Sequence, residues 1–173
     1  LVDTNELPHA TIKNIADKYK TDLSIIKSVV KSNNQRKMIL TKRIDKILNN
    51  KLKNKNITFL GVTFKPNTDD MREASSIPMI NYLNKKGSKI RYYDPSGRKK
   101  ELDKLKNVKF YSSVSSACIK SDLIIIHTEW NAFKLLDFKK LVKKKNFKVF
   151  DMRNIYSHDK MRNLKIDYTR IGR

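Results

Sequence analysis

Two basic side chains, Lys65 and Arg72, lie seven residues apart in the segment 61–73, which reads G-V-T-F-K-P-N-T-D-D-M-R-E. The apolar run 57–62 in front of them predicts a buried strand, and a helix is expected after them. A cationic loop between a strand and a helix is a typical place to hold phosphate in an α/β protein. The loop therefore predicts an anionic, phosphate-bearing ligand.

Further polar residues follow the other apolar runs of the chain. Asp94 comes after the run 89–93, the segment 128–130 follows the run 123–127, and Arg153 lies just beyond the run 147–150. In a parallel sheet the ends of such strands meet at one edge, so Lys65 and Arg153 are expected to converge there. Arginine suits bidentate phosphate contacts and lysine acts as a mobile point charge, a combination that fits a pyrophosphate better than a neutral ligand.

Strands and helices alternate from residue 51 to the end, which predicts a Rossmann-like α/β domain, doubly wound and mainly parallel. The expected strands are 57–62, 89–93, 108–111, 123–127, 147–150 and 168–171, and the expected helices are 77–86, 99–105, 114–120 and 138–144. Residues 1–50 instead predict a helical arm with a short helix at 5–18 and a long amphipathic helix at 23–48. Such a helix, without a partner in its own segment, usually packs against another domain or subunit.

Several kinds of site are absent from the sequence. Only four Gly are present and none forms a G-x-G-x-x-G array, so this domain is not expected to cradle a dinucleotide by itself. The three His have no metal-ligand spacing, and no metal is expected. The single Cys, Cys118, falls in a predicted helix and is interpreted as a buried structural thiol. No run is long enough to span a membrane, and a cytoplasmic location is expected.

The formal charge is +22, with 39 basic and 17 acidic residues. One interpretation is a nucleic-acid or anionic-membrane surface. The other is a general bias toward lysine, with the lysines filling solvated positions. We favour the second, because the lysines are spread over nearly every segment and no nucleic-acid motif is visible.

The wording of the loop 61–73 resembles the UDP-binding domain of the UDP-glucose 6-dehydrogenase family, whose members read G-hydrophobic-x-F-K-P-N-T-D-D-M-R-E/D here. The resemblance continues, in the same order, through the motifs Y-D-P at 93–95, H-T-E-W at 127–130, D-M-R-N-I-Y at 151–156 and I-G-R at 171–173. At the other end, Asp3-Thr4 and Asn34-Gln35-Arg36 look like the family's central helical region, so the resemblance covers essentially the whole chain.

The resemblance implies roles for individual residues. Phe64, Lys65 and Arg153 resemble the family's contacts to the UDP-sugar, and Arg72 resembles the arginine that reaches toward NAD bound on an N-terminal domain. For Arg72 a salt bridge with Asp69, Asp70 or Glu73 is the alternative. Asp3 matches the aspartate of the family's C-F-P-K-D-T segment, so the nucleophilic Cys would fall just before residue 1. Leu1 and Val2 depart from the Pro and Lys of that segment.

The implied function is the C-terminal part of an enzyme that oxidises UDP-glucose to UDP-glucuronate with two NAD, working as a homodimer joined through the helix 23–48. Since the chain starts at Leu1, we expect it to be a fragment that lacks the NAD-binding half and is inactive alone. Two alternatives stay open: a basic nucleic-acid-binding module, and a non-catalytic scaffold that dimerises through the same helix.

Overall fold

A computed structural model describes residues 14, 18–19 and 24–172. The chain divides into two compact units, 1–42 and 43–173. The division falls inside helix α2 (Ser24–Ile47). The presence of this helix confirms the long helix expected at 23–48. The short helix expected at 5–18 lies largely outside the described residues, and Asp3 lies outside them altogether.

The second unit is built on one six-stranded sheet, in which every neighbouring pair of strands is parallel. Its strands are β1 (Asn56–Leu60), β2 (Lys89–Tyr93), β3 (Val108–Phe110), β4 (Leu123–Ile126), β5 (Lys148–Asp151) and β6 (Asp167–Arg170). The spatial order is β3-β2-β1-β4-β5-β6. The predicted Rossmann-like α/β class is therefore confirmed, with the chain winding first one way from β1 and then the other.

The connections between the strands are helical and short. They comprise α3 (Ser76–Lys85), η2 (Lys100–Leu102), α4 (Val114–Cys118), η3 (Asn131–Phe133), α5 (Phe138–Leu141) and α6 (His158–Asn163). Ser113, Asp137 and Ser157 each accept a hydrogen bond from a backbone N–H in the first turn of the helix that follows. Such side-chain caps compensate for the low intrinsic stability of helices this short.

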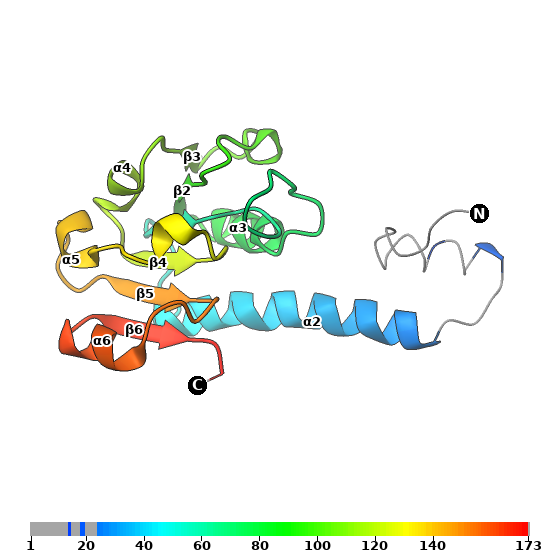
Figure 1. Cartoon of the computed structure of the whole chain (residues 1–173). Coiled ribbons are helices and arrows are strands. Elements are labelled where there is room, and N and C mark those ends of the chain that lie inside the picture. The colour runs from blue at the N-terminus through cyan, green and yellow to red at the C-terminus, as the bar shows by residue number, and fades with distance from the viewer. Residues whose placement is uncertain (1–13, 15–17, 20–23, 173) are drawn as a thin grey trace. The chain divides into compact units, whose positions relative to one another are not determined.

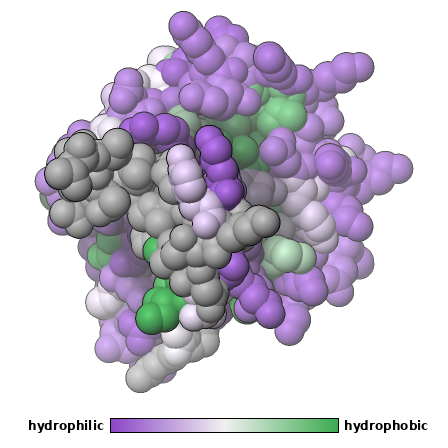
Figure 2. Space-filling model, turned by 90° about the vertical axis from the view of Figure 1, so that its right-hand side faces the viewer, coloured by the Kyte–Doolittle hydropathy of each residue, from purple (hydrophilic) through white to green (hydrophobic). Residues whose placement is uncertain are grey.

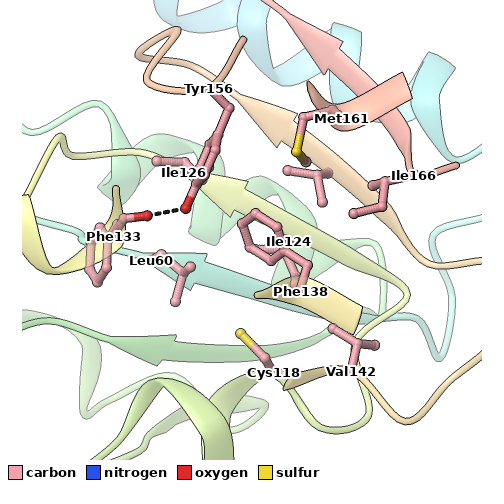
Figure 3. Packing of buried hydrophobic residues seen from close by; sticks show 11 residues of the cluster. Leu60, Cys118, Ile124, Ile126, Phe133, Phe138, Val142, Tyr156, Met161 and Ile166 are labelled. Atoms are coloured by element: carbon pink, nitrogen blue, oxygen red, sulfur yellow. Dashed lines mark hydrogen bonds between the residues drawn. The ribbon is translucent and has the colours of Figure 1, made fainter. Parts of the chain in front are cut away.

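The core between the sheet and α4, α5 and α6 is apolar and closely packed (Figure 3). Leu60, Ile124 and Ile126 supply the sheet side, while Phe138 and Met161 come from the helices. Burying a side chain of this size contributes about 1.5–3 kcal/mol. No α3 residue belongs to this cluster. Right-handed crossovers place α3 on the opposite face, since the connection from β1 to β2 runs the other way along the sheet.

Several local features differ from the sequence prediction, and the helix expected at 138–144 ends at Leu141 as α5. Strand β1 ends at Leu60 rather than at Val62, because Gly61 has a φ of 75°. The helix expected at 99–105 is only the 3-10 turn η2. Helix α6 was not predicted, because six residues are too few to show a helical period.

All six strands point the same way, so the loops that follow them share the carboxyl edge of the sheet. The arrows of β4, β5 and β6 point toward this edge in Figure 1. Figure 2 is turned by 90° so that this side of the molecule faces the viewer, and most of the coloured surface there is hydrophilic. The winding reverses between β1 and β4, which is where α/β sheets usually bind ligands. Among the described residues, no helix combines the length and apolar character needed to cross a lipid bilayer.

Candidate nucleotide-binding edge

The loop after β1 leaves the sheet through Gly61, a position that no other residue fits. Its φ of 75° is left-handed, and a Cβ built on it would lie 2.6 Å from Cβ of Thr128, at the end of the neighbouring strand. The backbones of the β1 and β4 ends can therefore approach each other only because this residue lacks a side chain.

A buried carboxylate directly after β2 holds the start of the same loop. Asp94 is 1% exposed, and its Oδ2 accepts hydrogen bonds from the N–H of Val62 at 2.7 Å and of Thr63 at 3.4 Å. Its other oxygen accepts from the N–H of Ser96 at 3.0 Å and from the Ser96 hydroxyl at 2.5 Å. Hydrogen bonds to a charged acceptor are the strong ones, so Asp94 fixes the first two residues of the loop.

Lys65 lies beyond this anchored start, in an exposed part of the loop. The backbone N–H of Phe64 donates to the carbonyl of Asp70 at 2.9 Å, which closes the loop at its base. The Lys65 ammonium has no ion-pair partner among the residues that the structure describes. Beside it, Phe64 leaves 51% of its surface exposed. An unpaired cation next to an exposed aromatic ring is suited to an anionic ligand that also has an apolar or stacking surface.

Arg153 follows β5 and is held from its inner end. Its Nε donates to the carbonyl of His127 at 2.6 Å, and a carboxylate oxygen of Glu129 lies 2.9 Å from the same nitrogen. Since Nε carries a single proton, which is directed at His127, the contact with Glu129 is an ion pair without a hydrogen bond. Within the described part of the chain, the two terminal nitrogens of Arg153 form no hydrogen bond, so they could donate to a ligand.

The structure places Arg72 differently from Lys65 and Arg153. Its Nε and one terminal nitrogen both donate to the carboxylate of Asp70 at 3.0 Å, and the side chain is 83% exposed. The Arg72 hydrogen bonds hold the pKa of Asp70 below its usual value. The structure thus shows the salt-bridge alternative from the sequence, with Asp70 as the partner. Exposed pairs of this kind contribute little to stability and can exchange partners.

His127 and Thr128 lie behind these loops, at the end of β4. His127 is fully buried; its Nε2 lies 2.8 Å from the hydroxyl of Ser75, and its Nδ1 lies 3.1 Å from the hydroxyl of Thr128. Burial lowers the pKa of His127 to about 3, and the positive charge of Arg153 acts in the same direction. The imidazole is therefore neutral at physiological pH, which agrees with the prediction that it is a local hydrogen-bonding residue.

Sequence reasoning placed Asp94 and Thr128 at this edge but did not assign them a role. The sequence showed only that each of them follows an apolar run; the burial of Asp94 and the contact of Thr128 with Gly61 depend on which strands become neighbours. Cys118 is fully buried on α4, and desolvation raises its pKa to about 12, which confirms a structural thiol. Among the described residues no cluster of His, Cys, Asp and Glu could hold a metal ion.

Comparison with known proteins assigns this arrangement to a family. Residues 58–158 match the model of the UDP-glucose/GDP-mannose dehydrogenase family, UDP binding domain. The UDP-glucose 6-dehydrogenase of Rickettsia typhi is 35% identical over 165 residues, which cover 93% of this chain and 38% of that protein. The UDP-glucose 6-dehydrogenase of Rhizobium meliloti is 31% identical over 167 residues, covering 95% of this chain and 38% of that one.

Solved structures show the same fold. A UDP-glucose dehydrogenase from Pyrobaculum islandicum matches with a TM-score of 0.74 at 20% identity, covering 95% of this chain and 35% of that chain. GDP-mannose dehydrogenase from Pseudomonas aeruginosa matches with a TM-score of 0.62 and also at 20% identity, covering 87% and 35%. This chain thus spans little more than a third of the length of the relatives that it matches. With the family model matching more than half of its residues, the chain belongs to the UDP-glucose/GDP-mannose dehydrogenase family and contains its UDP-binding domain.

Proposed function

We propose that this chain is the UDP-sugar-binding part of an NAD-dependent UDP-glucose 6-dehydrogenase. The observation that carries the proposal is that two basic side chains, Lys65 and Arg153, lie on loops at the carboxyl edge where the winding of the sheet reverses, with the terminal nitrogens of Arg153 free of hydrogen bonds to the described residues. A nucleoside diphosphate needs such charges for its pyrophosphate, and the family match names UDP as the nucleotide.

Lys65 and Arg153 would contact the pyrophosphate in different ways. Arg153 offers its two terminal nitrogens as a fork, because His127 and Glu129 hold its Nε. Lys65 adds a mobile positive charge from the facing loop. Phe64, half exposed beside Lys65, would cover an apolar surface of the ligand. We propose these three residues as the substrate contacts of this chain.

The chemical step would need residues beyond the described ones. NAD supplies the hydride acceptor when it is bound, and the proposal places its binding domain and a nucleophilic Cys in a preceding segment of the full enzyme. Asp3 would lie beside that Cys, and Arg72 would exchange Asp70 for the bound dinucleotide. By itself the chain is expected to bind UDP-glucose weakly and to form no NADH, a result that absorbance at the NADH band would check.

The assembly of the full enzyme is also a proposal. We infer a homodimer in which the helix α2, expected at 23–48, supplies the contact between subunits. In this proposal the helical segment 1–50 serves dimerisation and residues 51–173 form the UDP-sugar-binding domain. Two relatives named UDP-glucose 6-dehydrogenase support the choice of UDP-glucose over the GDP-linked substrates that the family name also includes. A cytoplasmic location would suit an enzyme that uses soluble nucleotides.

Calorimetric titration with UDP-glucose at moderate salt tests the substrate site. Replacing a charged hydrogen-bonding partner typically removes about 1.5–3 kcal/mol, so Lys65→Ala should weaken binding by about 10- to 150-fold. Lys85→Ala is the matched control, because it removes the same charge from an exposed position at the end of α3. Equal affinities of the two variants would contradict the assigned role of Lys65. Dimerisation of a folded chain that binds no UDP-glucose would favour the scaffold alternative.

A further inference from the structure

We propose that His127 and Thr128 act together as a strut that positions the two cation-bearing loops relative to each other. The inference rests on the proposed function, since it assigns a purpose to residues behind the same site. Neither residue is expected to touch the ligand: His127 is 1% exposed and Thr128 is fully buried. Both are therefore positioning residues rather than binding residues.

One end of the strut holds the loop that carries Lys65. The hydroxyl of Thr128 donates to the carbonyl of Thr63 at 2.9 Å. The hydroxyl of Thr63 in turn lies 3.1 Å from the carbonyl of Lys65, its nearer acceptor, and 3.5 Å from the carboxylate of Asp94. Thr128 thus reaches the backbone of Lys65 through a single intervening residue. Because Thr63 is fully buried, losing this contact would leave a buried carbonyl unpaired.

The other end holds Arg153. The carbonyl oxygen of His127 accepts the hydrogen bond from Nε of Arg153 at 2.6 Å. The peptide unit that joins His127 to Thr128 is planar and rigid, so the carbonyl that holds Arg153 and the Cα that carries the Thr128 side chain keep a fixed separation. A shift of this dipeptide would therefore displace Lys65 and Arg153 together. Such a displacement would weaken the binding of a ligand that contacts both of them.

The hydrogen bonds of the strut can run in one direction only. The Thr128 hydroxyl has a single proton, which it gives to the carbonyl of Thr63, so it must accept from Nδ1–H of His127. In a neutral imidazole Nε2 is then the acceptor, and the hydroxyl of Ser75 donates to it at 2.8 Å. The chain of donors thus runs from Ser75 through His127 and Thr128 to Thr63. The geometry assigns the Nδ1-protonated tautomer to His127.

The substitutions Thr128→Val and Thr128→Ser separate the hydroxyl from the shape of the side chain. Valine keeps the volume but loses the donor, and serine keeps the donor. We expect Thr128→Val to weaken binding of UDP by about tenfold, with affinity largely retained in Thr128→Ser. Equal affinities of the two variants would overturn the strut.

A double-substitution cycle distinguishes positioning from a general loss of structure. If Thr128 acts by placing Lys65, then Thr128→Val should weaken UDP binding far less in a Lys65→Ala background than in the unsubstituted chain. A purely structural role predicts the same factor in both backgrounds, and that result would overturn the proposal.

The tautomer supplies a test that needs no ligand. The ¹⁵N chemical shifts of the His127 ring in the unsubstituted chain report which nitrogen carries the proton. Protonated Nδ1 supports the strut, and protonated Nε2 overturns it. Failure of the unsubstituted chain to bind UDP would instead count against the proposed function, so the two ideas can fail separately.

Discussion

Acidification to pH 5 should destabilise this protein through His127. Burial lowers the pKa of His127 to about 3, while the unfolded chain has the ordinary value of 6.5. The positive charge of Arg153 opposes protonation further, and the partners of the ring on both sides are the hydroxyls of Ser75 and Thr128. Below pH 6.5 the unfolded state therefore binds a proton that the folded state does not. Stability is full above this pH and falls as the pH drops toward 3.

The size of the effect follows from the two pKa values. At pH 5.0 the pH is about 1.5 units below the pKa of 6.5 that the imidazole has in the unfolded chain, so that chain is protonated while the folded one is not. Each unit stabilises the unfolded state by about 1.36 kcal/mol. The free energy of unfolding should thus fall by about 2 kcal/mol between pH 7.5 and pH 5.0. The folded and unfolded pKa values both belong to the imidazole of His127, so a substitution that removes this ring should remove this part of the pH dependence.

Urea unfolding followed by the fluorescence of Trp130, the single Trp of the chain, measures this change. The unsubstituted protein, His127→Gln and His158→Gln are compared at pH 7.5 and 5.0. The control removes a histidine that is exposed at the start of α6, and its pH dependence should match that of the unsubstituted protein. His127→Gln should lose about 2 kcal/mol less on acidification. The same fall in all three proteins would refute the reasoning. Should His127→Gln not fold, an NMR titration of the unsubstituted chain decides the matter: the ring should stay neutral down to pH 5.

Three further predictions concern the frame of the site. Gly61→Ala should lower the free energy of unfolding by at least 1–2 kcal/mol in urea melts, because it adds left-handed strain and a 2.6 Å approach to Thr128; a melt unchanged from the original would contradict this geometry. Asp94→Asn should cost about 1–3 kcal/mol in the same assay, since it removes the charged acceptor of the loop's N–H groups, and retention of full stability would argue against its anchoring role. The thiol of Cys118 should not react with a disulfide reagent at pH 8 until urea unfolds the chain, because its pKa is raised to about 12; rapid reaction of the folded protein would show that it is accessible.

The elements of the sheet were predictable from the sequence because each buried strand is a short apolar run. The run at 123–126 lies in the middle of the sheet, where both faces are covered, and it therefore contains no polar residue. Placing Lys65 and Arg153 at one edge required only that the strands be parallel. In contrast, the expected helix at 99–105 is reduced to η2, where the N–H of Lys99 bonds instead to the hydroxyl of Tyr92.

The internal support of the site could not be predicted in the same way. The contact between Asp94 and Val62 joins residues 32 positions apart, and that between Thr128 and Thr63 spans 65 positions. Such contacts depend on which strands become neighbours, and hydrophobic periodicity carries no information about strand order. The ion pair of Arg72 with Asp70 is local, and the sequence did offer it as an alternative. The role of Asp3 stays a prediction.

Mapping the amide chemical shifts of the chain during a titration with UDP tests the central claim most directly. We expect saturable shifts in the amides that follow β1, β4 and β5, including those of Phe64, Lys65 and Arg153. The amides before β1, β2 and β5, where lysines are also plentiful, should move little. Shifts concentrated at those amino-terminal ends, or no saturable shifts in a folded sample, would contradict a UDP site at the carboxyl edge of the sheet.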